Sequence, residues 1–348
     1  MTRTSTTMAD SQSPQADSPV KRDRAIVAGL GRVGLDYACA LALHSSAVLV
    51  GFVEPRGDLR RFARGAGFQA PSETSLGRWL EKRAADTLVV CSPAAEAAEL
   101  VEKGIEAGLA VLVHGLAGMP REAVDRIEKA LGSTRRPAGA GSAVMFQPTF
   151  SRARRTGALS PERVQQVRAS GSVSRVFSPL VEPGRDVLEF LLADLLLLLD
   201  ASFGPVATVR ATGQRLYGEW IDECQVEAHF ANGLLAKVEA SWSVPDYPGT
   251  AMVIEGSGRE GRVIVSDDAL ETDFATMQGR VVAASEPLIA RSEGGDAPGV
   301  VAGWLRALAG DAESADALSV PRAVRVARVV DAVRQSIAAD GSERGVSE

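Results

Sequence analysis

Residues 25–35 read Ala-Ile-Val-Ala-Gly-Leu-Gly-Arg-Val-Gly-Leu, and this stretch decides how the N-terminal part of the chain folds. The apolar run at residues 25–28 predicts a buried parallel strand. Gly29, Gly31 and Gly34 follow with the spacing G-x-G-x-x-G, and a helical pattern comes next. In such a unit the first glycine makes the tight turn, the second lets backbone approach a pyrophosphate, and the third lets helix and strand pack closely.

A second apolar run supports this interpretation. Residues 48–53 predict another buried strand, which ends at Glu54, twenty residues after Gly34. An acidic residue at that point can accept hydrogen bonds from an adenosine ribose, and the N-terminus of the intervening helix would hold phosphates. The order strand, turn, helix, strand and acid predicts half of a dinucleotide-binding domain. The alternative is a doubly wound domain whose tight turn binds no nucleotide.

Composition limits the class of protein. The chain of 348 residues is long enough for about two domains. Its net charge is −6, and no run of Lys and Arg is interleaved with aromatic residues, so we expect no nucleic-acid partner. Cys39, Cys91 and Cys224 have neither disulfide-framework nor zinc spacing, which predicts no metal site and fits a reducing cytoplasm.

Two segments could be mistaken for a targeting signal or a membrane span. Residues 1–22 are rich in Ser, Thr, Pro and Gln and lack an apolar core, which predicts a disordered tail. Residues 190–199 are apolar, but this run has Asp194 at its centre and is about half as long as a membrane span. It predicts a buried helix, and we expect a cytoplasmic protein without a membrane contact.

Strands and helices alternate in the first part of the chain. Further strands are expected at 87–91, 110–114 and 142–146, with helices at 58–66, 75–83, 94–107 and 120–131. This alternation predicts an α/β fold whose N-terminal domain, residues 23–145, is a doubly wound Rossmann domain with a parallel sheet.

The pattern changes after residue 145. Strands are expected at 206–214, 223–230, 234–243, 251–255 and 262–265, with helices near 190–199, 300–308 and 321–338 and a loop at 285–298. Asn232-Gly233 is a strong hairpin signal between two of these strands. Residues 146–340 therefore predict a C-terminal α+β domain with an open, mostly antiparallel sheet, which would serve substrate binding and oligomerisation.

This arrangement resembles the Gfo/Idh/MocA family of NAD(P)-dependent oxidoreductases over nearly the whole chain. The resemblance rests on residues 29–34 with Glu54, on 85–93 and 108–113, on the hairpin within 223–245, and on 204–206. It implies NAD or NADP as cofactor, a small-molecule substrate, and a homodimer or homotetramer built on the open sheet face. The residues expected at the cofactor are Gly29, Gly31, Arg32, Val33, Gly34, Glu54, Ser92 and Pro93.

The chain departs from the family where the chemistry takes place. The family usually carries Glu-Lys-Pro, and its lysine is commonly proposed to exchange the substrate proton, but residues 114–116 read His-Gly-Leu. On the apolar helix the family usually has Asp-x-x-x-His, and counting back from Gly204 places Phe190 and Asp194 there. The histidine often present on an earlier helix is Ala97. The resemblance alone therefore does not carry the catalytic residues across.

Two residues could replace the missing groups. His114 ends a parallel strand at the side where open α/β sheets bind ligands, and histidine exchanges protons near neutral pH. Alternatively, it caps the strand by bonding to backbone. Asp194 stands on an apolar helix, where a carboxylate is costly unless it is paired, hydrogen-bonded or protonated. Asp194 therefore either lines the cleft between domains or pairs with an arginine packed over the helix.

The cofactor could be either nicotinamide dinucleotide. In the resembling family Glu54 favours NAD, because a carboxylate repels a 2′-phosphate. Arg56, Arg60 and Arg61 follow and could instead receive that phosphate.

A weaker resemblance links the chain to thiazolinyl imine reductases, which have histidine in place of the lysine and a leucine-rich helix like residues 194–199. Residues 146–152 resemble their segment after the sixth strand, with Gln147 where they carry tyrosine, although His114 here stands one position early. Three functions remain open. They are an NAD(P)-dependent oxidoreductase acting on a small polar carbonyl, alcohol or imine, a cyclic imine reductase of a natural-product pathway, and a non-catalytic dinucleotide-binding regulator or scaffold.

Overall fold

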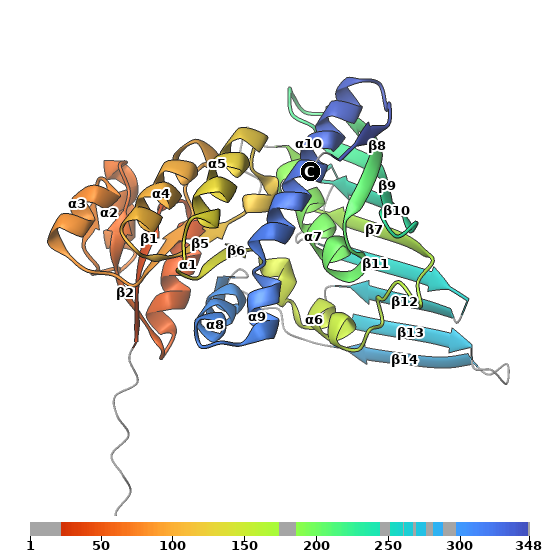
Figure 1. Ribbon diagram of the computed structural model, residues 1–348, viewed down its shortest axis with the longest axis horizontal. Helices are drawn as coiled ribbons and strands as arrows, with labels where there is room; N and C mark the ends of the chain where they lie inside the picture. Colours follow the sequence, from red (N-terminus) through yellow and green to blue (C-terminus); the bar gives the residue numbers. More distant parts are fainter. Residues whose placement is uncertain are drawn as a thin grey trace, which may run out of the picture.

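The structure is a computed structural model that describes residues 22–173, 186–243, 251–259, 261–266, 269–275, 281–287 and 297–346. The predicted tail, residues 1–22, lies outside this range except for its last residue. The described chain forms two sheets with helices on and between them (Figure 1). No helix in the described ranges is long and apolar enough to cross a membrane.

The first sheet is parallel throughout. Within the described chain it has six strands in the order β3-β2-β1-β4-β5-β6. The bounds are β1 Asp23–Ala28, β2 Ala47–Val53, β3 Ser72–Glu73, β4 Thr87–Val90, β5 Ala110–His114 and β6 Ala138–Gly141. The chain leaves β1 toward β2 on one side and later returns to β4 on the other. This reversal beside β1 is the switch point at which doubly wound sheets bind ligands.

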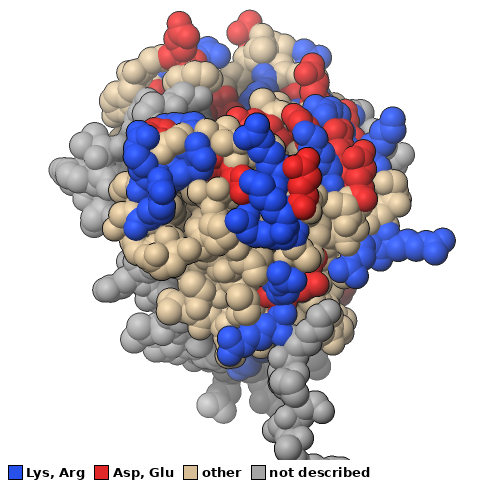
Figure 2. Space-filling model, turned by 90° about the vertical axis from the view of Figure 1, so that its left-hand side faces the viewer, with Lys and Arg blue, Asp and Glu red and all other residues tan. Residues whose placement is uncertain are grey.

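Helices cover both faces of this sheet, and each face has its own apolar core. Helices α1 (Arg32–Leu43), α2 (Gly57–Gly65) and α8 (Ala297–Leu308) share one core. Helices α3 (Leu76–Lys82), α4 (Ala94–Glu106) and α5 (Arg121–Gly132) pack into the other. Figure 2 shows the end of the molecule that carries α2 and α3, where basic and acidic side chains are interspersed. The predicted Rossmann arrangement is confirmed.

The second sheet is mixed but mostly antiparallel. In the described ranges nine strands follow the order β14-β13-β12-β11-β7-β10-β9-β8-β15, and only the β7–β10 pair among them is parallel. The bounds are β7 Gln166–Ser172, β8 Val206–Gln214, β9 Glu223–Phe230, β10 Leu235–Ser241, β11 Ala251–Gly258, β12 Gly261–Ser266, β13 Ala269–Ala275, β14 Val281–Pro287 and β15 Arg344–Gly345. The predicted hairpin at Asn232-Gly233 joins β9 and β10.

Two long helices lie between the sheets. Helix α7 (Leu191–Phe203) packs on β7 and β10, whereas α10 (Val320–Ala338) packs on β8 and α5 (Figure 1). Buried and more exposed residues alternate along β9, so one face of this sheet is covered and the other is open. The fold class predicted from the sequence is confirmed. We propose that the two domains divide between residues 145 and 146. Helix α8, although late in the sequence, packs on α1 of the first domain.

The sequence prediction was wrong for the last strand of the first sheet. Residues 142–146 were expected to form it, but β6 is Ala138–Gly141, and Ala143–Phe146 form a short 3-10 helix, η2. The strand consists only of alanine and glycine because large side chains lie against it. A Cβ at Gly139 would lie 3.0 Å from the Trp304 ring, and one at Gly141 would lie 2.7 Å from the Tyr37 hydroxyl.

Other elements went unpredicted. They are β3, α6 (Pro148–Arg155), β7, α9 (Ala312–Ala317), β13, β14 and β15. The loop expected at residues 285–298 is partly wrong, because 285–287 belong to β14 and 297–298 to α8. Residues 288–296 of that prediction lie outside the described residues.

Candidate active site

A cavity of about 720 Å³ lies at the carboxyl ends of the parallel strands. It begins beside Glu54 and Arg56 after β2, passes the glycine turn, and reaches His114 after β5. On the opposite side α7 contributes Asp194, and α10 contributes its first turn. The cavity is therefore lined both by the strand ends of the first sheet and by helices that pack on the second sheet. This is the position expected for a ligand of a doubly wound domain.

The three glycines of the turn differ in what surrounds them. Gly29 has a φ of 89°, and a Cβ there would lie 2.7 Å from the backbone nitrogen of Ser92. A Cβ at Gly34 would lie 1.8 Å from the carbonyl oxygen of Gly29. By contrast, a Cβ at Gly31 would have no atom of the described chain within 4 Å other than those of its chain neighbours. Packing therefore requires the first and third glycines, whereas the second opens toward the cavity.

The N-terminus of α1 faces this opening. Gly31 is its N-cap and has no side chain to bond the first N–H groups, and no acidic residue stands in the first turn. The first N–H groups of a helix have no partner inside the helix, and the helix dipole makes them attractive to an anion. Val33 lines the cavity, whereas Arg32 is exposed and Gly34 is buried, and neither of these two lines the cavity.

Glu54 is held in a fixed position at the other end of the turn. Its side chain is buried, and one carboxylate oxygen accepts a hydrogen bond from the Leu30 N–H at 2.8 Å while the other accepts one from the Arg56 N–H at 2.9 Å. Each carboxylate oxygen has a second lone pair. Glu54 lines the cavity and can therefore still accept hydrogen bonds from ribose hydroxyls.

The arginines after Glu54 do not form a preorganised phosphate site. The Arg56 guanidinium donates to Asp58 at 2.8 Å, and both side chains are exposed. Arg56 lines the cavity, whereas Arg60 and Arg61 do not. Ser92 and Pro93 line it from the start of α4, directly across the turn from Gly29.

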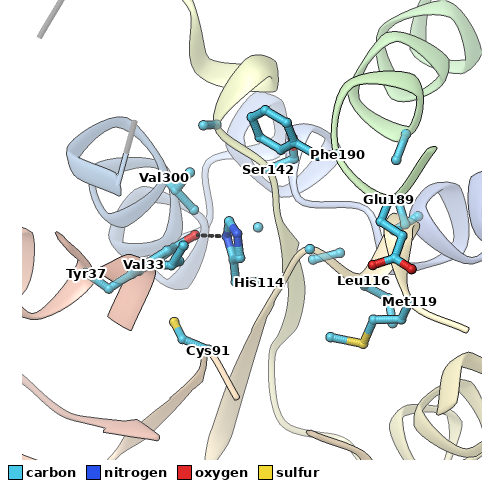
Figure 3. A pocket seen from close by; sticks show the side chains of 18 of the residues that line it. Val33, Tyr37, Cys91, His114, Leu116, Met119, Ser142, Glu189, Phe190 and Val300 are labelled. Atoms are coloured by element: carbon cyan, nitrogen blue, oxygen red, sulfur yellow. Dashed lines mark hydrogen bonds between the residues drawn. The ribbon is translucent and has the colours of Figure 1, made fainter. Parts of the chain in front are cut away.

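His114 is oriented by a tyrosine of α1. The Tyr37 hydroxyl lies 3.2 Å from His114 Nδ1, and the two rings meet edge to face with their centroids 5.5 Å apart (Figure 3). Tyr37 is only 1% exposed, so the surrounding core fixes its hydroxyl. Because the two ring nitrogens of an imidazole point in divergent directions, a contact at Nδ1 leaves Nε2 directed away from the Tyr37 hydroxyl.

Gly115 occupies the position at which the resembling family carries its lysine. It has a φ of 68°, and a Cβ built there would have no atom within 4 Å other than those of its chain neighbours in the described chain. Gly115 lines the cavity, so the space beside its backbone is open to a ligand.

Asp194 lies at the cavity, as the first of the two interpretations expected. The Ser142 hydroxyl donates to its carboxylate at 2.7 Å, and both residues line the cavity. Ser142 follows Gly141, which pairs with His114 across β5 and β6. His114 and the Ser142–Asp194 pair thus come from neighbouring strand ends. Asp200, also on α7, contacts two arginines of α10, Arg325 at 2.7 Å and Arg322 at 3.4 Å.

Several cavity residues were not singled out from the sequence. Asp36 and Tyr37 line it from α1, Ser142 from the residue after β6, and Glu189 from the turn before α7. Burial raises the pKa of Asp36, and Arg32 partly offsets this effect. One signal was available, because after Arg32 at its start the helix that follows the glycine turn is mostly apolar except at Asp36 and Tyr37.

Other groups in the cavity are less suited to acid–base chemistry. The Cys91 thiol lines the same cavity as His114 (Figure 3). Burial raises the pKa of Cys91 further above neutrality, so this thiol stays protonated. Within the part of the chain that the structure describes, no group of three His, Cys, Asp or Glu side chains could hold a metal ion.

Comparisons with known proteins address the fold. No protein-family model and no curated protein matches the sequence. Levoglucosan dehydrogenase in complex with NADH and L-sorbose is 18% identical with a TM-score of 0.76, and the match covers 94% of this chain and 100% of that one. GenD2 from gentamicin A biosynthesis in complex with NAD is 20% identical with a TM-score of 0.72, covering 97% and 100%. An oxidoreductase domain protein from Kribbella flavida is 18% identical with a TM-score of 0.79, covering 94% and 100%.

These matches span essentially the full length of each solved structure. Both sheets, with the helices between them, are therefore shared, and not the nucleotide-binding half alone. The resemblance predicted from the sequence is thereby confirmed at the level of the fold. The chain has the two-domain fold of the Gfo/Idh/MocA oxidoreductases.

Proposed function

We propose that this protein is an NAD(P)-dependent oxidoreductase that moves a hydride to or from a small carbonyl, alcohol or imine compound. One observation carries the proposal. A single cavity joins Gly31 and Glu54, which suit a dinucleotide, to His114 and Asp194, which suit proton transfer and substrate binding.

The residues present fit a nicotinamide dinucleotide. The open side of Gly31 and the N–H groups that begin α1 would receive the pyrophosphate, and Glu54 would accept the ribose hydroxyls. Such a cofactor, when bound, supplies or accepts the hydride. We favour NAD, because Glu54 is held in the cavity while Arg56 pairs with exposed Asp58. The levoglucosan dehydrogenase and GenD2 structures, which contain NADH and NAD, support this preference.

His114 replaces the family's lysine in this proposal. Reduction of a carbonyl or imine requires a proton at the oxygen or nitrogen as its charge develops. Tyr37 holds Nδ1 of His114, so Nε2 is the atom that gives or takes this proton. Tyr37 is a positioning residue, because it acts through the imidazole.

Asp194 binds and orients the substrate. Its carboxylate is fixed by the Ser142 hydroxyl and lies on the α7 side of the cavity. A carboxylate there accepts a hydrogen bond from a substrate hydroxyl, amine or iminium group. This would hold the reacting carbon near the end of β5, where His114 stands.

The competing function is a non-catalytic regulator or scaffold that holds a dinucleotide. The absence of the family's lysine, with Gly115 in its place, favours that alternative. The deciding experiment incubates the purified protein with NADH or NADPH and panels of sugar ketones, cyclitol ketones and cyclic imines, following absorbance at 340 nm. Turnover of any panel member supports the oxidoreductase. Tight cofactor binding without turnover of any compound would favour the scaffold.

The assembly is also part of the proposal. We expect a homodimer or homotetramer that forms through the open face of the second sheet, where Glu227 and Lys237 pair at 3.5 Å on neighbouring strands. Light scattering after size-exclusion chromatography measures the assembly directly. Lys237→Glu, which reverses the charge, should weaken the assembly.

A further inference from the structure

The substrate end of the cavity is largely apolar. Around His114 and Asp194 its described walls include Leu116, Met119, Met145, Phe190, Leu197 and Met252. These side chains come from the turn after β5, from η2, from α7 with its N-cap, and from β11. Figure 3 shows Phe190, Leu116 and Met119 around the space next to His114. Such a wall favours an apolar ligand surface, because burying it releases water from both sides.

Two positions account for much of this character. Phe190 places an aromatic ring on the cavity wall, and Gly115, which also lines the cavity, has no side chain. A substrate in this part of the cavity therefore meets the Phe190 ring and the backbone of Gly115.

Most of the described polar side chains at this end already have partners in the protein. The Ser142 hydroxyl donates to Asp194, the Tyr37 hydroxyl contacts His114, Glu189 contacts Arg334 at 3.0 Å, and Arg322 from the first turn of α10 contacts Asp316 at 2.8 Å. Gln147 has a buried side-chain oxygen without a hydrogen-bond partner in the described chain. A buried hydroxyl without a partner is costly, so a compound with hydroxyls around its whole ring would leave several unsatisfied.

We infer that the substrate is a mostly apolar cyclic ketone or imine with one hydrogen-bonding group at its reactive end, and that polyols are excluded. This inference rests on the proposed function. In reduction, the C=O or C=N carbon gains a hydride from a dihydronicotinamide, which is oxidised. The electron pair of the π bond goes to oxygen or nitrogen, which gains a proton from His114. The apolar body of the molecule packs against Phe190 and Met119.

Ligand-observed NMR tests the inference without requiring turnover. The full-length protein is titrated with cyclohexanone and with its pentahydroxy counterpart, the ketone of myo-inositol. A second pair is 2-phenyl-1-pyrroline and a polyhydroxylated pyrroline, so the two arms separate ketones from imines. We expect at least one apolar compound to bind at least about tenfold more tightly than its hydroxylated counterpart, since burying one large apolar side chain is worth that much.

Variants locate the binding. Phe190→Ala should weaken binding of the apolar compound about tenfold. Met119→Gln, which keeps the size of the side chain, should weaken this binding several-fold. The matched control is Phe62→Ala, because Phe62 is 61% exposed on α2, outside the cavity. It should leave the affinity unchanged. Circular dichroism checks the fold of each variant, and Met119→Gln keeps the test decisive if Phe190→Ala does not fold.

The inference is overturned if the hydroxylated member of each pair binds as tightly as the apolar one. It is also overturned if both cavity variants fold and bind the apolar compound as the parent protein does. A separate titration with NADH tests the proposed function itself. If the protein binds the apolar compounds selectively but does not bind NADH, the proposed oxidoreductase function is refuted, whereas the apolar character of the cavity is established.

Discussion

The two ends of the cavity differ in what makes them suitable for a ligand. At the cofactor end the site is formed mainly by backbone, namely that of Gly29 and Gly31 and the first N–H groups of α1. At the substrate end, side chains such as His114 and Phe190 define it. Backbone geometry can stay the same while the sequence changes, whereas a side chain can be exchanged without altering the fold. The fold therefore predicts the cofactor end better than it predicts the substrate.

The largest expected effect separates the two ends at His114. His114→Asn should lower turnover about 10²–10⁴-fold, the usual contribution of a general acid or base, while NADH affinity stays nearly unchanged. Steady-state kinetics and calorimetry measure the two quantities. His44→Asn is the matched control, because His44 lies at the C-terminus of α1, outside the cavity and away from the open sheet face. Equal turnover in both variants would contradict the assignment of His114.

Tyr37→Phe sharpens the same test. It removes only the hydroxyl next to Nδ1, so turnover should fall less than in His114→Asn and the pH–rate profile should shift. A fall in turnover with an unchanged profile would instead point to a packing role for Tyr37.

The cofactor end should respond to added bulk. Gly31→Val places a branched side chain in the space expected for the pyrophosphate, so NADH should bind about 10–100-fold more weakly. Calorimetry provides the dissociation constant. The control is Gly77→Val on α3, where a Cβ also has open space but lies outside the cavity. If Gly31→Val binds NADH normally, the dinucleotide is not held by this turn.

Glu54 should set the choice of cofactor. Glu54→Gln keeps the size of the side chain but removes its charge, so the preference for NADH over NADPH should fall about tenfold, as for loss of a hydrogen bond to a charged group. Parallel titrations with the two cofactors measure the ratio. A preference for NADPH in the parent protein, lost in Arg56→Ala, would show that Arg56 receives a 2′-phosphate and that Glu54 is not decisive.

The smallest effect concerns the stability of the helix shared by both ends. Burial raises the pKa of Asp36, so the native state holds its proton more strongly than the unfolded chain does. The corresponding stabilisation is present at low pH and is lost as pH rises through the raised pKa. Asp36→Asn should therefore increase the melting temperature at pH 8 more than at pH 4. A difference that shrinks with rising pH would contradict this account.

The parts of the fold that could be predicted are those with strong local patterns. The strand–turn–helix of residues 25–43 and the hairpin at Asn232-Gly233 carry their signals within a few residues. Strand β6 does not, because its run of alanine and glycine is required by Trp304, which comes from a helix more than 150 residues later in the chain. Strand β7 is similar, since a Cβ at Gly171 would lie 3.2 Å from Leu195 of α7. Only tertiary contacts reveal such strands.

The candidate site was predictable to the same extent. The ends of predicted strands placed Glu54 and His114 at the same edge of the sheet, and both line the cavity. The cost of a lone carboxylate on an apolar helix drew attention to Asp194. The partners that fix these groups, Tyr37 and Ser142, were not predicted, because each hydrogen bond joins residues more than fifty positions apart.

The most direct test of the central claim is a crystal structure of the protein with NADH bound. We expect the pyrophosphate at the start of α1, the adenosine ribose on Glu54 and the nicotinamide ring beside His114. This result would join the two ends of the cavity in one reaction site. A dinucleotide bound outside the cavity, or a nicotinamide ring directed away from His114, would contradict the account.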